Sequence, residues 1–182
     1  DCYAHLGRYQ EAEALYLYVE EFERTVLGES FDAYPTTISR MGDLYAFQGQ
    51  HKKAEAFHIR AIDLAKEHFL PQDLYLFYNM EQAYLFFEKV KDWKQIQSIA
   101  LDCFERNCMD EIPSSGLLEN IESLAEKQNF ATMPYALKSL KIASKSYWEQ
   151  YKIDKEDAQL VQAYELQLAT RTVLHRLKNS FS

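Results

Sequence analysis

A short motif recurs along the chain at a fixed spacing. Residues 7–14 read GRYQEAEA, and residues 49–56 read GQHKKAEA, a shift of 49 − 7 = 42 positions. A weaker copy, KDWKQIQS, occupies residues 91–98 and keeps the shift, since 91 − 49 = 42. A fixed period of this size is typical of proteins that stack several copies of one small structural unit.

The sizes of the repeated residues predict that each unit is a pair of helices. Gly42 and Ala83 hold one equivalent position, and Ala12 and Ala54 hold another. Small side chains there let two antiparallel helices approach closely. The step from Gly42 to Ala83 is 83 − 42 = 41, so the sequence predicts one extra residue in the turn of the third hairpin, near Val90.

The apolar residues within each copy have helical spacing. They are Ala12, Leu15, Tyr16 and Val19 in the first copy, and Ala54, Phe57, Ala61 and Ile62 in the second. A stripe of this kind buries one face of a helix. The 182 residues include only 5 Gly and 4 Pro but 13 Tyr and 11 Phe, which favours helices joined by short turns. The sequence therefore predicts an all-α fold.

These residues resemble the tetratricopeptide repeat family, and the 42-residue period resembles its kinesin light chain type. The linker over residues 26–37, which opens with Val26-Leu27-Gly28 and ends with Thr36-Thr37, has the character of that type. The resemblance implies a right-handed superhelical solenoid of antiparallel hairpins. Ser39-Arg40 and Met80-Glu81 stand where kinesin light chain repeats usually carry an Asn pair, so no cargo specificity is carried over.

The repeat pattern also predicts how the chain is divided. We expect three hairpins over residues 1–107, the first truncated at its N-terminus, and a divergent fourth hairpin over 108–152 with helices at 116–128 and 133–151. Residues 153–182 should form a long C-terminal helix, from about residue 155 to 179, that caps the solenoid or continues into a signalling module. Because Asp1 falls partway through a repeat helix, we expect a fragment of a larger protein.

Composition and motifs argue against several classes of function. The formal charge of −8 is unfavourable for binding nucleic acid or anionic lipid. Three cysteines, Cys2, Cys103 and Cys108, are too few for a disulfide scaffold and favour the reducing cytoplasm. Cys103 matches small core positions of other repeats.

The sequence carries no sign of catalytic chemistry. His51 and His58 fall at packing positions of the repeat. The glycines form no phosphate-binding loop, and the cysteines lack zinc-site spacing. We expect no enzyme, no cofactor, no metal and no membrane span.

The family resemblance implies a concave groove that binds a protein or peptide. Its inward positions are Thr36, Ser39, Asp43, Ala46 and Phe47 in the second hairpin, Met80, Tyr84, Phe87 and Glu88 in the third, and Ala4 and His5 in the first. An alternative assigns Phe47, Met80 and Phe87 to the core. Acidic and aromatic residues together suggest a ligand with basic and apolar groups.

Two functions fit these expectations. The first is a protein-binding scaffold or adaptor, and the alternative is the sensor region of a multidomain bacterial signalling or transcription regulator. Exposed repeat ends are a candidate surface for self-association.

Overall fold

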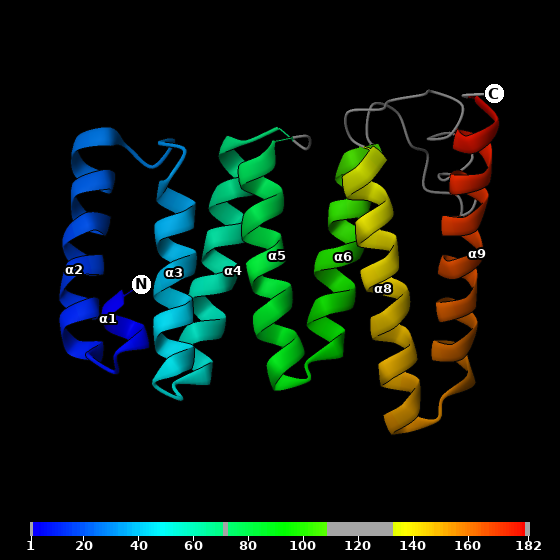
Figure 1. Cartoon of the computed structure of the whole chain (residues 1–182), viewed down its shortest axis with the longest axis horizontal. Coiled ribbons are helices and arrows are strands. Elements are labelled where there is room, and N and C mark those ends of the chain that lie inside the picture. Colours follow the sequence, from blue (N-terminus) through cyan, green and yellow to red (C-terminus); the bar gives the residue numbers. More distant parts are fainter. Residues whose placement is uncertain (1, 71–72, 109–132, 181–182) are drawn as a thin grey trace. The chain divides into compact units, whose positions relative to one another are not determined.

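The computed structural model describes residues 2–70, 73–108 and 133–180, and every regular element among them is a helix (Figure 1). The predicted all-α class is confirmed. The chain divides into two compact units, Asp1–Val90 and Lys91–Ser182. This boundary falls between the two helices of the third predicted hairpin.

The first unit contains two helix pairs and one further helix. Its elements are α1 (Cys2–His5), α2 (Tyr9–Phe22), the π-helix η1 (Glu23–Leu27) that continues α2, α3 (Tyr34–Phe47), α4 (His51–His68) and α5 (Leu74–Val90). Helix α3 packs against α2, α4 and α5. Helix α3 is therefore the central helix of this unit.

The period of 42 residues is present in the helix boundaries. Helices α2 and α4 begin at Tyr9 and His51, and α6 (Trp93–Cys108) begins 42 residues later still. The fourth residue of each helix, Ala12, Ala54 or Ile96, is buried. The sequence repeat thus corresponds to a repeat of helices.

A left-handed residue ends the helix before each repeat motif. Gly7 and Gly49 both have φ +74°, and each turn carries the same pair of hydrogen bonds: in the second, the N–H of Gln50 donates to the carbonyl of Tyr45 (2.9 Å) and that of Gly49 to Ala46 (3.0 Å). This is the Schellman pattern that glycine favours.

Lys91, the third residue in the series, has φ 60° and adopts the same left-handed conformation without being glycine. The extra residue of the third copy does not lie in the turn, so that prediction was wrong. Helix α5 runs on to Val90, and only Lys91 and Asp92 separate it from α6, whereas residues 48–50 separate α3 from α4. The insertion lengthens the helix because α5 can continue by one residue without breaking its hydrogen-bond ladder.

Gly42 marks the close approach of α3 to α4. A Cβ atom built on Gly42 would lie 3.0 Å from Cδ2 and Nε2 of His58 and 3.2 Å from the carbonyl oxygen of Ala54. His58 is fully buried, and its ring stacks on Phe86 with 4.9 Å between ring centroids. The expectation of a small residue at this helix crossing is confirmed.

Two polar clusters, each built on a tyrosine, a glutamate and basic side chains, join α2, α3 and α4. In the first, the Tyr45 hydroxyl on α3 donates to Glu13 on α2 at 2.7 Å. Lys53 of α4 lies 3.6 Å from the same carboxylate and 3.6 Å from the centroid of the Tyr45 ring.

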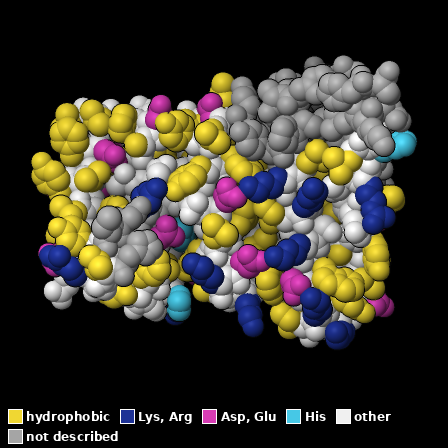
Figure 2. Space-filling view, viewed as in Figure 1, with side chains coloured by type: hydrophobic (Ala, Val, Ile, Leu, Met, Phe, Trp, Pro, Cys, Tyr) yellow, Lys and Arg dark blue, Asp and Glu magenta, His cyan; other side chains and the backbone are white. Residues whose placement is uncertain are grey.

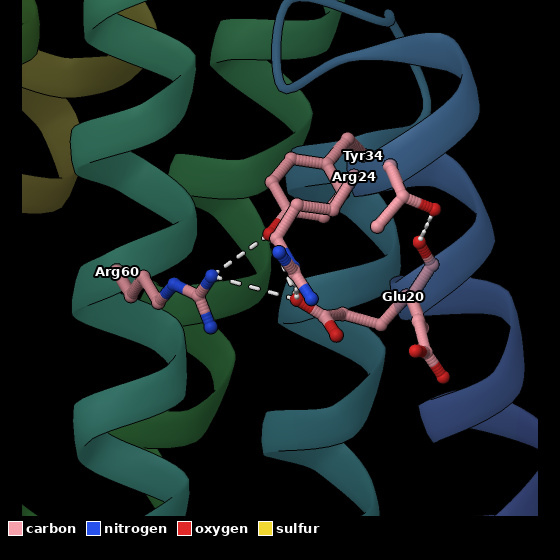
Figure 3. Close-up of polar contacts among 6 residues, drawn as sticks. Glu20, Arg24, Tyr34 and Arg60 are labelled. Carbon is pink, nitrogen blue, oxygen red and sulfur yellow. Dashed lines mark hydrogen bonds and ion pairs between the residues drawn. The ribbon is translucent and has the colours of Figure 1, made fainter.

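The second cluster lies two turns farther along α2 and α4 (Figure 3). The Tyr34 hydroxyl donates to Glu20 at 2.9 Å and accepts from Arg60 at 2.8 Å. Arg24 lies 3.5 Å from the Glu20 carboxylate. Burial is the main reason that the pKa of Tyr34 is raised to about 12, and its hydrogen bond to Glu20 acts in the same direction.

The second unit contains α6, α8 (Met133–Asp154) and α9 (Asp157–Ser180). Helix α8 packs against both others, and the Ser144 hydroxyl donates to the carbonyl of Ala163 on α9 at 2.9 Å. Cys103 is buried, so its assignment to the core is confirmed. Helices α8 and α9 agree with the predicted ranges 133–151 and 155–179, whereas the helix predicted at 116–128 lies outside the described residues.

The C-terminal helix differs from the polar cap that a solenoid end would need. Val161 and Leu168 of α9 are both more than half exposed. Its assignment as a cap stays a prediction.

Candidate functional site

The first unit contains a cavity of about 360 Å³, which we call the first-unit cavity. Arg40, Asp43 and Phe47 share the face of α3 that lines it, since they recur at helical spacing. The other lining residues are Ala4 of α1, Tyr16 of α2, Leu44 and Ala46 of α3, His51 of α4, and Gln82, Leu85, Phe86, Lys89 and Val90 of α5.

Charges of both signs meet around Asp43. Its side chain is 39% exposed, and burial raises the pKa of its carboxyl, although Lys89 and Arg40 act in the opposite direction. Arg40 also donates to the Tyr78 hydroxyl of α5 at 3.3 Å. The cavity therefore holds two cations and one carboxylate among apolar walls.

His58 lies beneath this cluster as a neutral ring. Its Nε2 is 3.5 Å from Oδ1 of Asp43, and its Nδ1 is 3.4 Å from the hydroxyl of Ser39. Burial, with a smaller effect from the charge of Lys89, lowers the pKa of His58 to about 4. We therefore do not regard the contact with Asp43 as an ion pair at neutral pH. The expected packing role of His58 is confirmed.

The structure brings only some of the predicted groove residues together. Asp43, Phe47, Ala46 and Ala4 line the first-unit cavity. Four others are buried: Ser39, Met80, Tyr84 and Phe87. Thr36 and Glu88 are partly exposed but do not line the cavity, and the side chain of His5 lies outside the described residues.

The face of α5 explains the difference. The repeat register pairs Tyr84 with Asp43, since 84 − 43 = 41, and so selects the face of α5 that is equivalent to the cavity face of α3. A helix beside α3 must, however, turn a different face toward it. That face carries Gln82, Leu85 and Lys89, whose spacing of three and seven residues was a usable signal.

His51 was predicted to pack but is exposed and lines the cavity. It is the first residue of α4, beside the turn, and is shorter than Tyr9 and Trp93 at the same repeat position. It cannot reach back over the helix as those larger rings can.

Among the described residues, no group of three or more His, Cys, Asp or Glu side chains is placed to hold a metal ion. Within the same part of the chain, every helix is too short or too polar to cross a bilayer.

A family model agrees with this architecture over the N-terminal part. Residues 1–67 match the family model of the tetratricopeptide repeat. Among solved structures, the chain is similar to a Podosopora anserina protein described as a kinesin light chain with nearly identical TPR-like repeats, at 12% identity and a TM-score of 0.49, over 92% of this chain and 91% of that one. No curated protein matches the chain. The family model therefore assigns residues 1–67 to the tetratricopeptide repeat superfamily.

Proposed function

We propose that the chain is a protein-binding scaffold and that the first-unit cavity holds a peptide segment of its partner. Tetratricopeptide repeats are generally scaffolds for protein interaction. The observation that carries the proposal is the composition of the cavity, in which the exposed apolar residues Phe47 and Leu85 lie beside Arg40, Asp43 and Lys89. Such a mixture of apolar area and a few polar groups is typical of binding sites.

The charges around Asp43 change the ligand that we expect. The sequence suggested a basic ligand because Asp43 and Glu88 were the only charges assigned to the groove. Arg40 and Lys89 offset the charge of Asp43, and Glu88 does not line the cavity. We therefore propose a peptide that inserts an apolar side chain, with its carbonyl or carboxylate oxygens toward Lys89 and an N–H toward Asp43.

A charged substitution within the apolar wall tests this site. Peptides selected on the unmodified chain by phage display should bind Leu85→Arg about tenfold more weakly or worse, because a guanidinium would occupy the apolar part of the cavity. Fluorescence anisotropy with the labelled peptides measures the change.

Leu74→Arg is the matched control, since Leu74 lies on the same helix, is 65% exposed against 48% for Leu85, and is not part of the cavity. Circular dichroism checks that both variants keep their helices. Equal affinity of the two variants would show that the peptides bind elsewhere.

We further propose that a second copy of the chain covers an apolar face of α2. Leu15, Val19 and Phe22 are exposed along α2. The residues 42 positions later, Phe57, Ala61 and Leu64, are partly or fully buried on α4, which packs against α3. The face of α2 thus has the pattern of a surface that another helix covers.

Self-association through α2 should depend on protein concentration. Light scattering after size-exclusion chromatography should give a mass above that of one chain, and Leu15→Glu with Phe22→Glu should restore the single-chain mass because two carboxylates cannot be buried there. Val161→Glu with Leu168→Glu is the control on exposed apolar residues of α9. A single-chain mass for the unmodified protein at high concentration would exclude the dimer.

The regulator alternative and the cytoplasmic location stay predictions.

A further inference from the structure

The second unit contains a groove of about 550 Å³ along α8 and α9, which we call the α8–α9 groove. Lys141, Lys145 and Trp148 line it from α8 at spacings of four and three residues, so they lie on one face of the helix. The other lining residues are Ser144 of α8, and Ala163, Tyr164, Gln167, Thr170, Arg171 and Leu174 of α9.

The charge of this groove is opposite to that of the whole chain. The chain has 28 acidic residues against 20 Lys and Arg, yet the described residues that line the groove include three cations, Lys141, Lys145 and Arg171, and none of them is acidic. All three side chains are exposed. In Figure 2, dark-blue Lys and Arg side chains lie between yellow hydrophobic ones over the second unit.

Exposed apolar side chains accompany these cations. Trp148 is 41% exposed, Tyr164 60% and Leu174 44%. The floor between them is made of small residues. There the Ser144 hydroxyl donates a hydrogen bond to the carbonyl oxygen of Ala163. Aromatic residues on a shallow floor, next to Lys and Arg, form a surface that can take apolar and acidic side chains together.

The dimensions of the groove fit a short helix. From Ala163 to Leu174 the axis of α9 rises by 11 residues, or about 16 Å at 1.5 Å per residue. That length equals about three turns of a helix lying parallel to α8 and α9. The hydroxyl contact between Ser144 and Ala163 places Lys141, Lys145 and Trp148 beside the Ala163 end of this length, and Arg171 lies about two turns farther along α9.

We propose that the α8–α9 groove binds a short amphipathic helix of a partner protein that carries acidic and apolar residues. Its carboxylates would lie against Lys141, Lys145 and Arg171, and its apolar side chains against Trp148 and Tyr164. A nucleic acid is a poorer fit, because a chain of net charge −8 repels a polyanion more strongly than a peptide with few acids. The site is distinct from the first-unit cavity in its residues and in the charge of its ligand.

Binding of designed peptides tests the proposal. The probe is a fluorescein-labelled helical peptide of about three turns, built from Glu, Leu and Phe at helical spacing. Its twin has Lys in place of each Glu. Anisotropy with the full chain should show binding of the Glu peptide at least about tenfold tighter than of the Lys peptide, with the difference decreasing in high salt. Lys141→Glu with Lys145→Glu should abolish the preference for the Glu peptide. Trp148→Ala should weaken the binding of both peptides.

Lys152→Glu is the control, because it reverses a charge on the same helix outside the groove, where Lys152 pairs with Glu149 at 2.7 Å. It should leave the preference unchanged. Equal binding of the two peptides, an unchanged preference in the double variant, or tighter binding of a labelled single-stranded oligonucleotide would overturn the proposal. Leu85→Arg, which tests the first-unit cavity, should have no effect on this binding.

Discussion

Acidification from pH 7 to pH 4 should reduce the free energy of unfolding by about 3 kcal/mol through His58 alone. The pKa of His58 is lowered in the folded state from 6.5 to about 4, and each pKa unit corresponds to about 1.4 kcal/mol. Below pH 6.5 the His58 imidazole is protonated in the unfolded chain but stays neutral in the folded chain. The stabilising effect of the neutral ring is therefore complete above pH 6.5 and is lost as the pH falls to about 4.

The groups that face the ring modify this dependence. Asp43, 3.5 Å away, has a raised pKa, so its protonation favours the folded state at acidic pH and offsets part of the loss. The charge of Lys89 acts against the protonated ring. Ser39 and Phe86, which also contact the ring, do not titrate.

Urea unfolding at a series of pH values measures the effect, and His58→Gln should reduce the slope between pH 6.5 and 4. His51→Gln is the control on the exposed histidine of the same helix. If His58→Gln does not fold, the NMR titration of the imidazole in the unmodified chain decides: a ring that protonates near pH 6.5 would contradict the prediction.

The repeat register was readable from the sequence because its signals are local. A left-handed turn residue recurs every 42 residues before α2, α4 and α6, and a small residue stands in the fourth position of α2 and α4, with Ile96 in its place on α6. Close packing at Gly42 follows from the same pattern, because a Cβ there would lie only 3.0 Å from the His58 ring and 3.2 Å from the Ala54 carbonyl oxygen.

The walls of the first-unit cavity and of the α8–α9 groove were less predictable because they depend on which face each helix turns toward its neighbour. Repetition predicts equivalent faces of α3 and α5, but the first-unit cavity is lined by non-equivalent faces, and so Lys89 was missed. Arg40 shares a face of α3 with Asp43 and Phe47, so its spacing from them was a usable signal. Lys141, Lys145 and Arg171 lie outside the repeated motif. Their joint placement required the pairing of α8 with α9.

Gly42→Val should destabilise the first unit by about 3 kcal/mol, the cost of overpacking a tight helix crossing. The nearest atoms belong to a fully buried ring stacked on Phe86 and to the backbone of Ala54, and neither can move aside readily. Gly42→Ala should reduce the free energy of unfolding by less, because alanine is favoured over glycine in a helix by about 1 kcal/mol. Urea or thermal unfolding measures both, and Ala56→Val on the exposed face of α4 is the control for a β-branched residue in a helix.

A double-mutant cycle separates the steric conflict from a general loss of stability. If the imidazole is the main obstacle, His58→Ala should make room for the valine, and the double variant should be more stable than the sum of the two single effects by more than about 1 kcal/mol. The rescue should be partial, because the Ala54 carbonyl stays 3.2 Å from the new Cβ. Strict additivity would mean that α3 and α4 separate to admit the side chain, and that Gly42 does not determine their distance.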